Sequence, residues 1–500
     1  MFNIKRVLLI SVATATMIGC SKDFLEVDPQ GQLTELQALG DPGAAEKLVG
    51  GVYNTLYLGE FGNTTVGFLY ALANDVASDD SDKGSTPSDF PAAGEIDNFT
   101  LTTNNSILNN LWNGHYLGIA RANRAVDILE QSTFEESVKN SLLAEVRFLR
   151  GLYYFNLVRF FGGVPKVIRV PDPAEGNSDE FQTRATAEEI YQVVIDDLQF
   201  AVDNLPLKGA TPVGRTTKGA AQSYLAKVYL YRKDYQKAYD LSKEVINSGL
   251  YSLVPDYELI FREKPFNGAG GNNNTESVFE VQTGINLGEN AVSKLYSNGQ
   301  GPRGRGGWND LGFGFNSPSQ DLANAYEPED TRRGATIIFI NPASAGTVLW
   351  DGYRIPSQDS VENPRYNYKA YHSPIAESPQ LSNNKDTKPK NIRLMRYAEV
   401  LLINAEAAAN LGNADATTHL NMVRSRAGLP ASVGTIENIW RERRVELAME
   451  HDRFFDLVRQ GRASTVLASK GFVAGRNEVF PIPQAQIDLS GGRLTQNPGY

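Results

Sequence analysis

Apolar residues recur at helical spacing along two long stretches of the chain. The segment 135–161 carries Leu142, Val146, Leu149 and other apolar residues around most of its circumference, which is typical of a helix buried on all sides. Glycines and a proline follow at 162–165 and end it. The same periodicity predicts helices over 42–58, 109–131, 135–161, 187–204, 218–232, 235–247, 392–411, 414–426 and 436–459.

Two other stretches lack helical periodicity. Residues 75–106 are rich in Asp, Ser, Gly and Pro and predict a long loop. Residues 250–391 are dominated by Gly, Pro, Asn and aromatics, with short strand-like pieces such as SVFEVQT, ATIIFI and TVLW. Because a disordered linker would carry few aromatic residues, we predict an ordered, loop-rich lobe at 250–391.

Two helix pairs share the spacing of a tetratricopeptide unit. In that unit a small residue lets two antiparallel helices approach each other. The same interval separates Tyr229 from Ala238 and Ala407 from Ala416. Two generic helical hairpins would satisfy the spacing as well. We predict a mainly α fold, a tetratricopeptide-like helical-repeat scaffold that carries a loop-rich, short-stranded ligand-binding lobe.

The N-terminus has the layout of a bacterial secretory signal. Lys5 and Arg6 precede an apolar run at 7–16, and Cys20 is the single cysteine among 500 residues. The stretch 17–20 resembles a lipobox, which predicts a signal peptide at 1–19 and a lipidated Cys20 at the start of an extended leader, 20–40. A free or buried thiol is the alternative. Several acyl chains on one cysteine would hold the protein stably on a membrane.

Composition limits which partners the protein can bind and which reactions it can catalyse. The formal charge is −10 and becomes −12 when the two cations of the signal are removed, which disfavours nucleic acid as a partner. A single cysteine excludes an intrachain disulfide framework and a cysteine-based metal cluster. The four histidines match no metalloprotease motif, and neither a nucleophile elbow nor a P-loop occurs. We therefore expect no enzyme activity, no cofactor and no metal site.

Five blocks of sequence carry a resemblance. The stretches AEVRFLRGLYYFNLVRFFGGVP (144–165), NIRLMRYAEVLLINAEAAANLG (391–412), LNMVRSRAGLP (420–430), IWRERRVELAMEHDRFFDLVRQG (439–461) and FPIPQAQIDLSGGRLTQNPGY (480–500) resemble the SusD/RagB lipoproteins. The resemblance implies a SusD-like helical part at 41–249, the ligand-binding lobe at 250–391 and a SusD/RagB helical part at 392–500.

That resemblance also implies location and partners. SusD/RagB proteins are lipid-anchored in the outer membrane of Bacteroidetes and face outside the cell. They cap a SusC-type TonB-dependent transporter and load nutrients into it, usually oligosaccharides. We therefore expect a cell-surface glycan-binding lipoprotein that delivers oligo- or polysaccharide to such a transporter. A peptide-binding protein of the RagB type and a glycoside hydrolase are the alternatives.

Charged residues on the helices that resemble the family are expected to form internal ion pairs, because a buried charge needs a partner. They are Glu145, Arg147, Arg150, Arg396, Glu399, Glu406, Arg441, Arg443, Arg444 and Glu446.

Candidate ligand residues follow from the chemistry of sugars. Aromatic rings cover the C–H face of a pyranose, and amides and carboxylates bind its hydroxyls. The lobe offers both kinds of group. Acids of the first long loop, 75–106, are candidates as well, because members of the family that the chain resembles draw ligand contacts from that loop. The alternatives are a small local core for the aromatics and a solvated face or a calcium site for the acids. The candidates are Trp308, Trp350, Tyr296, Tyr353, Asn309, Asp310, Asp75 and Asp80.

Overall fold

Helix α7 (Glu136–Phe161) lies at the centre of the helical part. Almost every residue from Leu142 to its end is buried, as the apolar circumference predicts. It packs between α6 (Ser106–Glu130) and α9 (Ala187–Asn204). The computed structural model describes residues 35–59, 61–283, 291–305, 311–377 and 388–500.

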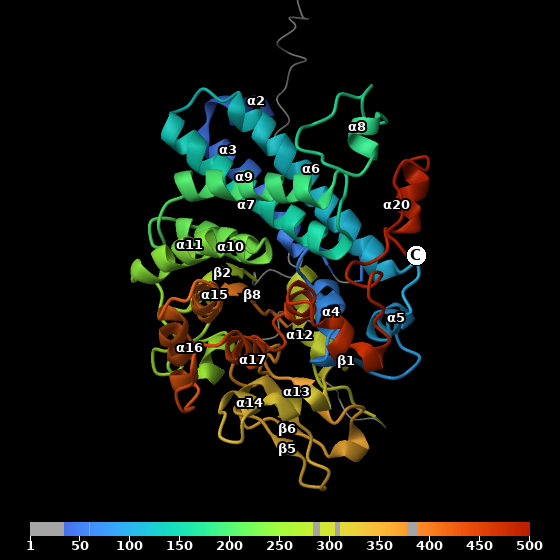
Figure 1. Ribbon diagram of the computed structural model, residues 1–500, viewed down its shortest axis with the longest axis vertical. Helices are drawn as coiled ribbons and strands as arrows, with labels where there is room; N and C mark the ends of the chain where they lie inside the picture. The colour runs from blue at the N-terminus through green and yellow to red at the C-terminus, as the bar shows by residue number, and fades with distance from the viewer. Residues whose placement is uncertain (1–34, 60, 284–290, 306–310, 378–387) are drawn as a thin grey trace, which may run out of the picture.

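The helices that follow stack in pairs (Figure 1). Helix α10 (Lys218–Tyr231) packs on α11 (Tyr235–Asn247), α11 on α15 (Tyr397–Asn410), and α15 on α16 (Asp415–Arg426). The small residues Ala238, Ala407 and Ala416 are buried where these helices meet. The mainly α, tetratricopeptide-like fold is thus confirmed.

Short elements complete the described chain. The remaining helices are α2 (Glu35–Gly40), α3 (Pro42–Tyr53), η2 (Asn54–Tyr57), α4 (Phe68–Val76), α5 (Pro91–Asp97), α8 (Asp179–Gln182), η3 (Tyr257–Phe261), α12 (Ala291–Gln300), α13 (Gln320–Ala325), α14 (Arg332–Thr336), η4 (Gln358–Ser360), α17 (Ile436–Glu446), α18 (Arg453–Arg459), α19 (Ala463–Val466), η5 (Ala468–Lys470) and α20 (Gln484–Leu489). No described helix combines the length and the apolar content needed to span a bilayer.

The described residues form four antiparallel two-stranded ladders, of which all but the last join segments well separated in the sequence. The pairs are β1 (Ser81–Gly84) with β3 (Phe315–Pro318), β2 (Ser277–Val281) with β8 (Ile392–Arg396), β4 (Ile337–Phe339) with β7 (Arg365–Asn367), and β5 (Thr347–Val348) with β6 (Arg354–Ile355). The last two pairs lie in the lobe at the lower end of Figure 1.

The two largest hydrophobic clusters among the described residues lie in the helical part and in the lobe. The first runs from Ala45 in α3 to Leu494 near the C-terminus, so the helices before and after the lobe share one interior. The second, here called the lobe core, holds the lobe strands together. It consists of Leu311, Ile338, Ile340, Leu349, Ile355, Val361, Tyr366 and Tyr371.

Several predicted boundaries are wrong. Part of the expected leader is helical, since α2 begins at Glu35, and the expected loop 75–106 contains β1 and α5. The predicted helix 392–411 begins as strand β8, because these residues pair with β2. The predicted helix 436–459 breaks at 447–452, where Met449 and His451 adopt positive φ of 62° and 74°. Cys20 lies outside the described residues.

Buried ion pairs fill the helical part, as predicted. Arg396 is 1% exposed and binds Glu276, Glu446 (3.1 Å) and Glu450 (2.6 Å). Arg150 binds Asp197 through two nitrogens at 2.7 and 2.8 Å. The others are Glu145–Arg215, Arg147–Asp197, Arg443–Glu399, Arg459–Glu406 and Arg444–Asp80. Arg441 is the exception, because its side chain lies on the exposed face of α17.

Removing one buried cation should destabilise the protein strongly. Arg396→Met leaves three buried carboxylates without this partner, and we expect the free energy of unfolding to fall by about 3–5 kcal/mol in urea titrations. Arg169→Ala is the control, since Arg169 pairs with Glu175 on the surface, and we expect it to cost at most about 1 kcal/mol. Equal losses in the two variants would contradict this interpretation.

Stability should also depend on pH through His115. Burial lowers the pKa of His115 to about 4, while its Nδ1 lies 2.6 Å from the Leu111 carbonyl and its Nε2 3.1 Å from Asn156 Nδ2. Between pH 6.5 and 4 the unfolded chain takes up a proton here that the folded chain does not. The free energy of unfolding should therefore fall by about 1.4 kcal/mol per pH unit from this group as the pH is lowered.

His115→Gln tests this contribution, because glutamine does not titrate. We expect a flatter curve of unfolding free energy against pH for the variant between pH 6.5 and 4, measured by urea unfolding. Parallel curves for the variant and the natural protein would show that His115 does not carry the dependence.

Candidate functional site

Trp350 and Tyr353 pack against the lobe core. The guanidinium of Arg262 lies 3.9 Å from the centre of the Trp350 ring, so a cation covers one ring face. The backbone N–H of Trp350 donates to the Tyr368 hydroxyl at 2.9 Å. The hollow beside the ring measures about 20 Å³, and Glu377 also lines it. A sugar could stack on the covered ring face only after Arg262 moved.

Trp308, Asn309 and Asp310 lie outside the described residues. The residues on either side form backbone hydrogen bonds within the lobe. The Arg305 N–H donates to the Ser360 carbonyl at 2.7 Å, and the Leu311 N–H donates to the Pro302 carbonyl at 2.9 Å. Leu311 belongs to the lobe core. Trp350 packs against the same core.

Asp75 and Tyr296 meet inside the protein rather than on its surface. Both contact His451, whose Nδ1 lies 2.8 Å from Asp75 Oδ2 and whose Nε2 lies 2.9 Å from the Tyr296 hydroxyl. All three side chains are buried, and burial raises the pKa of Tyr296. The sequence predicts both as ligand contacts, but in the structure they lie in the interior and their polar atoms have internal partners.

Asp80 is also internal. It is 1% exposed, and its Oδ1 accepts from Arg444 Nε at 2.7 Å. The neighbouring Asp79 binds Arg453 through both oxygens at 2.8 Å. Asp80 was expected to contact ligand from a loop, but the segment folds inward to neutralise arginines of α17 and α18. Those arginines also hold the carboxylates that a calcium ion would need.

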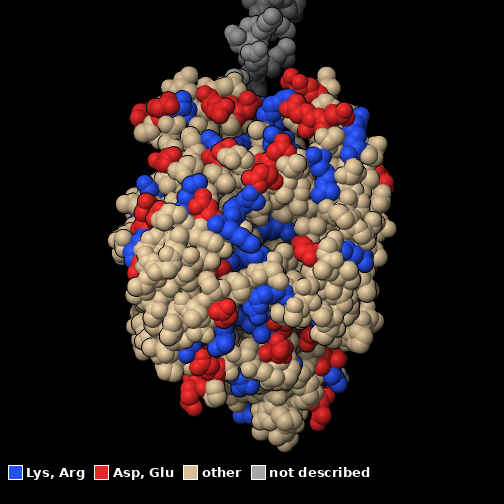
Figure 2. All heavy atoms as spheres, in the orientation of Figure 1, with Lys and Arg blue, Asp and Glu red and all other residues tan. Residues whose placement is uncertain are grey.

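A charged cleft surrounds these pairs. It encloses about 560 Å³, and its lining includes Asp82, Asp321, Arg462 and Lys470. Arg444 pairs with Asp321 across it at 2.6 Å, and Lys470 pairs with Asp97 at 2.6 Å. Figure 2 shows basic side chains along the middle of this face of the molecule, with acidic ones interspersed. These ion pairs already use much of the charge on the cleft wall.

Aromatic and charged side chains meet on the surface between the first long segment and the lobe. Phe61 is 49% exposed, and its ring centre lies 5.4 Å from that of Phe90 and 6.5 Å from that of Phe313. Beside them, Arg303 binds Ser85 Oγ at 2.8 Å and pairs with the carboxylate of Asp89. We call these six residues the aromatic–arginine surface.

This surface has the two groups that a sugar needs, a ring face or edge and partly exposed polar atoms. The side chains of Arg303 and Asp89 are 30% and 32% exposed. Sequence reasoning missed it, although aromatic residues within Gly-, Ser- and Pro-rich segments were a usable signal. Phe90 satisfies that criterion as well as Trp308 does. The sequence instead predicts ligand contacts by two acids of that segment, Asp75 and Asp80.

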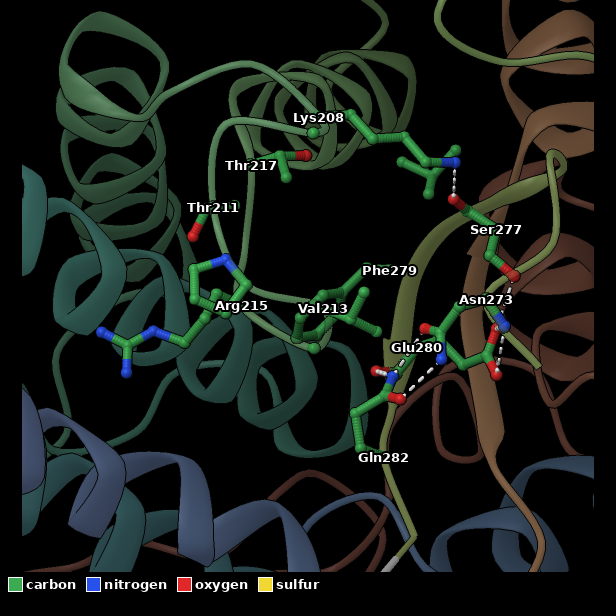
Figure 3. A pocket seen from close by; sticks show the side chains of 14 residues that line it. Lys208, Thr211, Val213, Arg215, Thr217, Asn273, Ser277, Phe279, Glu280 and Gln282 are labelled. Atoms are coloured by element: carbon green, nitrogen blue, oxygen red, sulfur yellow. Dashed lines mark hydrogen bonds between the residues drawn. The ribbon is translucent and has the colours of Figure 1, made fainter.

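A separate pocket lies between the segment 208–217 and strand β2 (Figure 3). It measures about 180 Å³, with Val213 and Phe279 among its apolar walls. Lys208 Nζ donates to the Ser277 carbonyl at 3.0 Å, and burial lowers its pKa. Glu280 accepts from the backbone N–H of Asn273 at 3.2 Å. Because these polar atoms hydrogen-bond to one another, the surface that the pocket offers to a ligand is mainly apolar.

Two family models match most of the chain. One is described as the SusD family and matches residues 275–500, and the other is described as starch-binding, associating with outer membrane, and matches residues 23–230. The chain belongs to the SusD family.

SusD-like relatives match over most of their length. SusD-like protein P2 of Formosa agariphila is 27% identical, and the match covers 98% of each chain. A SusD-like protein of Bacteroides ovatus is 28% identical, with 91% of this chain and 82% of the relative covered. The named relatives are SusD-like or starch-binding proteins rather than enzymes.

Solved SusD-family structures share the fold. A laminarin-binding SusD-like protein superposes with a TM-score of 0.76 at 29% identity, covering 92% of this chain and 99% of that one. Surface glycan-binding protein A from Bacteroides thetaiotaomicron, solved in complex with laminarihexaose, gives 0.75 at 25% identity, covering 92% and 99%.

Proposed function

We propose that the protein captures an oligo- or polysaccharide at the cell surface and passes it to a SusC-type TonB-dependent transporter, without catalysing a reaction. The observation that supports glycan capture most directly is the likeness, over 92% of the chain, to a laminarin-binding protein and to a protein solved with laminarihexaose. The buried acids of the helical part are bound to arginines, which favours a structural role for them over a hydrolytic one.

The glycan contacts, in this proposal, come from the aromatic–arginine surface together with Trp308, Asn309 and Asp310. Phe61 is its most exposed ring, and the neighbouring guanidinium and carboxylate would bind sugar hydroxyls. Trp350 and Tyr353 form a second, weaker patch, because Arg262 already covers the tryptophan. Asp75, Asp80 and Tyr296 support the site from inside.

Binding should depend on the exposed rings. We expect Trp308→Ala and Phe61→Ala each to weaken glycan affinity about tenfold or more, since truncating an aromatic contact typically costs over 1 kcal/mol. Trp350→Ala should change affinity by less than about threefold. Isothermal titration of the full-length protein against laminarin, starch and a wider polysaccharide panel measures this.

Leu489→Ala is the control, because Leu489 is an exposed apolar residue on α20. We expect its glycan affinity to be unchanged. Binding of peptides but of no polysaccharide would show that the protein captures a peptide nutrient and not a glycan. Release of reducing sugar by the purified protein would establish a hydrolase.

Anchoring is proposed to depend on Cys20. Cys20→Ser removes the acceptor of the acyl chains, and we expect the variant to leave the outer-membrane fraction while its glycan affinity in solution stays the same. Cell fractionation with mass spectrometry of the mature N-terminus tests this. A variant that remained in the membrane fraction would require another anchor.

A further inference from the structure

A buried histidine lies beside two buried glutamates behind the Trp350 patch. His372 Nδ1 is 2.7 Å from Glu263 Oε1 and 3.8 Å from Glu377 Oε2. The side chains of Glu263, His372 and Glu377 are only 6%, 0% and 2% exposed. One donor atom from each residue falls within 4.8 Å of the others. Three such donors around one point are the minimum that a metal ion needs.

Backbone N–H groups hold one of these side chains, that of Glu377, in place. Glu377 Oε1 accepts from the Glu263 N–H at 2.7 Å, and Oε2 accepts from the Ser373 N–H at 2.8 Å. Glu377 therefore ties the segment after η3 to the segment after β7. Within the part of the chain that the structure describes, His372 Nε2 has no hydrogen-bond partner. Nδ1 faces both glutamates, so it is the ring nitrogen that would coordinate an ion.

The local charge favours a cation. Lys390 is the buried ammonium that interacts with both Glu263 and Glu377, so one carboxylate charge remains when His372 is neutral. Asp351 adds another, since its Oδ2 accepts from the Tyr371 hydroxyl, beside His372, at 2.8 Å.

An approach from solvent exists on one side. Glu377 lines the hollow beside Trp350, together with Glu258, Tyr368 and Tyr371. The hollow has room for about one water molecule. An ion held by the three donors would have its remaining coordination position available to that water.

We propose that Glu263, His372 and Glu377 bind a first-row transition-metal ion, and that Zn²⁺ fits them best. One imidazole and two carboxylates suit zinc, whereas calcium and magnesium prefer oxygen donors alone. In a tetrahedral zinc site neighbouring donors lie about 3.4 Å apart, and the separations of 2.7 and 3.8 Å bracket that value. The ion would cross-link η3 to the segment that carries Glu377, independently of glycan capture.

The test uses untagged, full-length protein treated with a chelator and dialysed. Isothermal titration with zinc chloride should give one ion per chain with a dissociation constant in the micromolar range or below, and calcium chloride should give no comparable binding. We expect His372→Gln and Glu377→Gln each to weaken zinc binding at least about tenfold. Glu258→Gln is the matched control, because Glu258 lines the same hollow outside the donor set, and its zinc affinity should be unchanged.

Cobalt titration of the natural protein needs no variant. Co²⁺ in the site should give visible absorption bands more intense than those of aqueous Co²⁺. A spectrum identical to aqueous Co²⁺, absence of zinc uptake at about 100 μM, or equal zinc affinity in folded His372→Gln would each overturn the proposal. Circular dichroism shows whether the two variants are folded. If neither variant folds, the cobalt spectrum of the natural protein tests the proposal.

Discussion

One buried carboxylate, Glu446, connects the two halves of this protein. Arg332 at the start of α14, Arg396 at the end of β8 and Arg426 at the end of α16 all bind it, at 2.9, 3.1 and 2.5 Å. Burial alone would raise the pKa of Glu446, but these guanidinium groups hold it well below its ordinary value. Removing any partner leaves a charge in a medium that solvates it poorly. The helical repeats and the lobe are therefore bound through charge as well as through apolar packing.

The same network explains why the chain bends where it does. Helix α17 ends at Glu446, and the residues after it turn so that Glu450 reaches Arg396 and Asp452 reaches Arg159 at 2.9 Å. His451 follows the same turn and contacts Asp75 and Tyr296. A continuous helix would carry these three side chains around its axis and could not place all of them in the interior. The irregular segment is thus a consequence of satisfying buried polar groups.

In the proposed function, ligand contact falls to the segments attached to the rim of this helical part. Leu311, which follows Asp310 in the sequence, belongs to the lobe core, and the aromatic–arginine surface lies where β1, β3 and the lobe come together. Rings placed on a rigid support lose little freedom on binding, which favours recognition of a large, uncharged ligand such as a glycan. The proposed metal donors lie behind the Trp350 patch and would stiffen that part of the lobe.

The sequence by itself determined the helices, their pairing and the presence of internal ion pairs, because periodicity and small-residue spacing are local properties of the chain. It also marked the lobe by its aromatics. It misassigned β8 and the break after Glu446, and it did not show that Asp75, Asp80 and Tyr296 are buried. Only the tertiary structure decided these, because each depends on a partner distant in the sequence, such as His451 for Asp75 or Arg444 for Asp80. A carboxylate in a polar segment has the same sequence context whether it faces solvent or an arginine. Only the packing of the folded chain distinguishes the two cases.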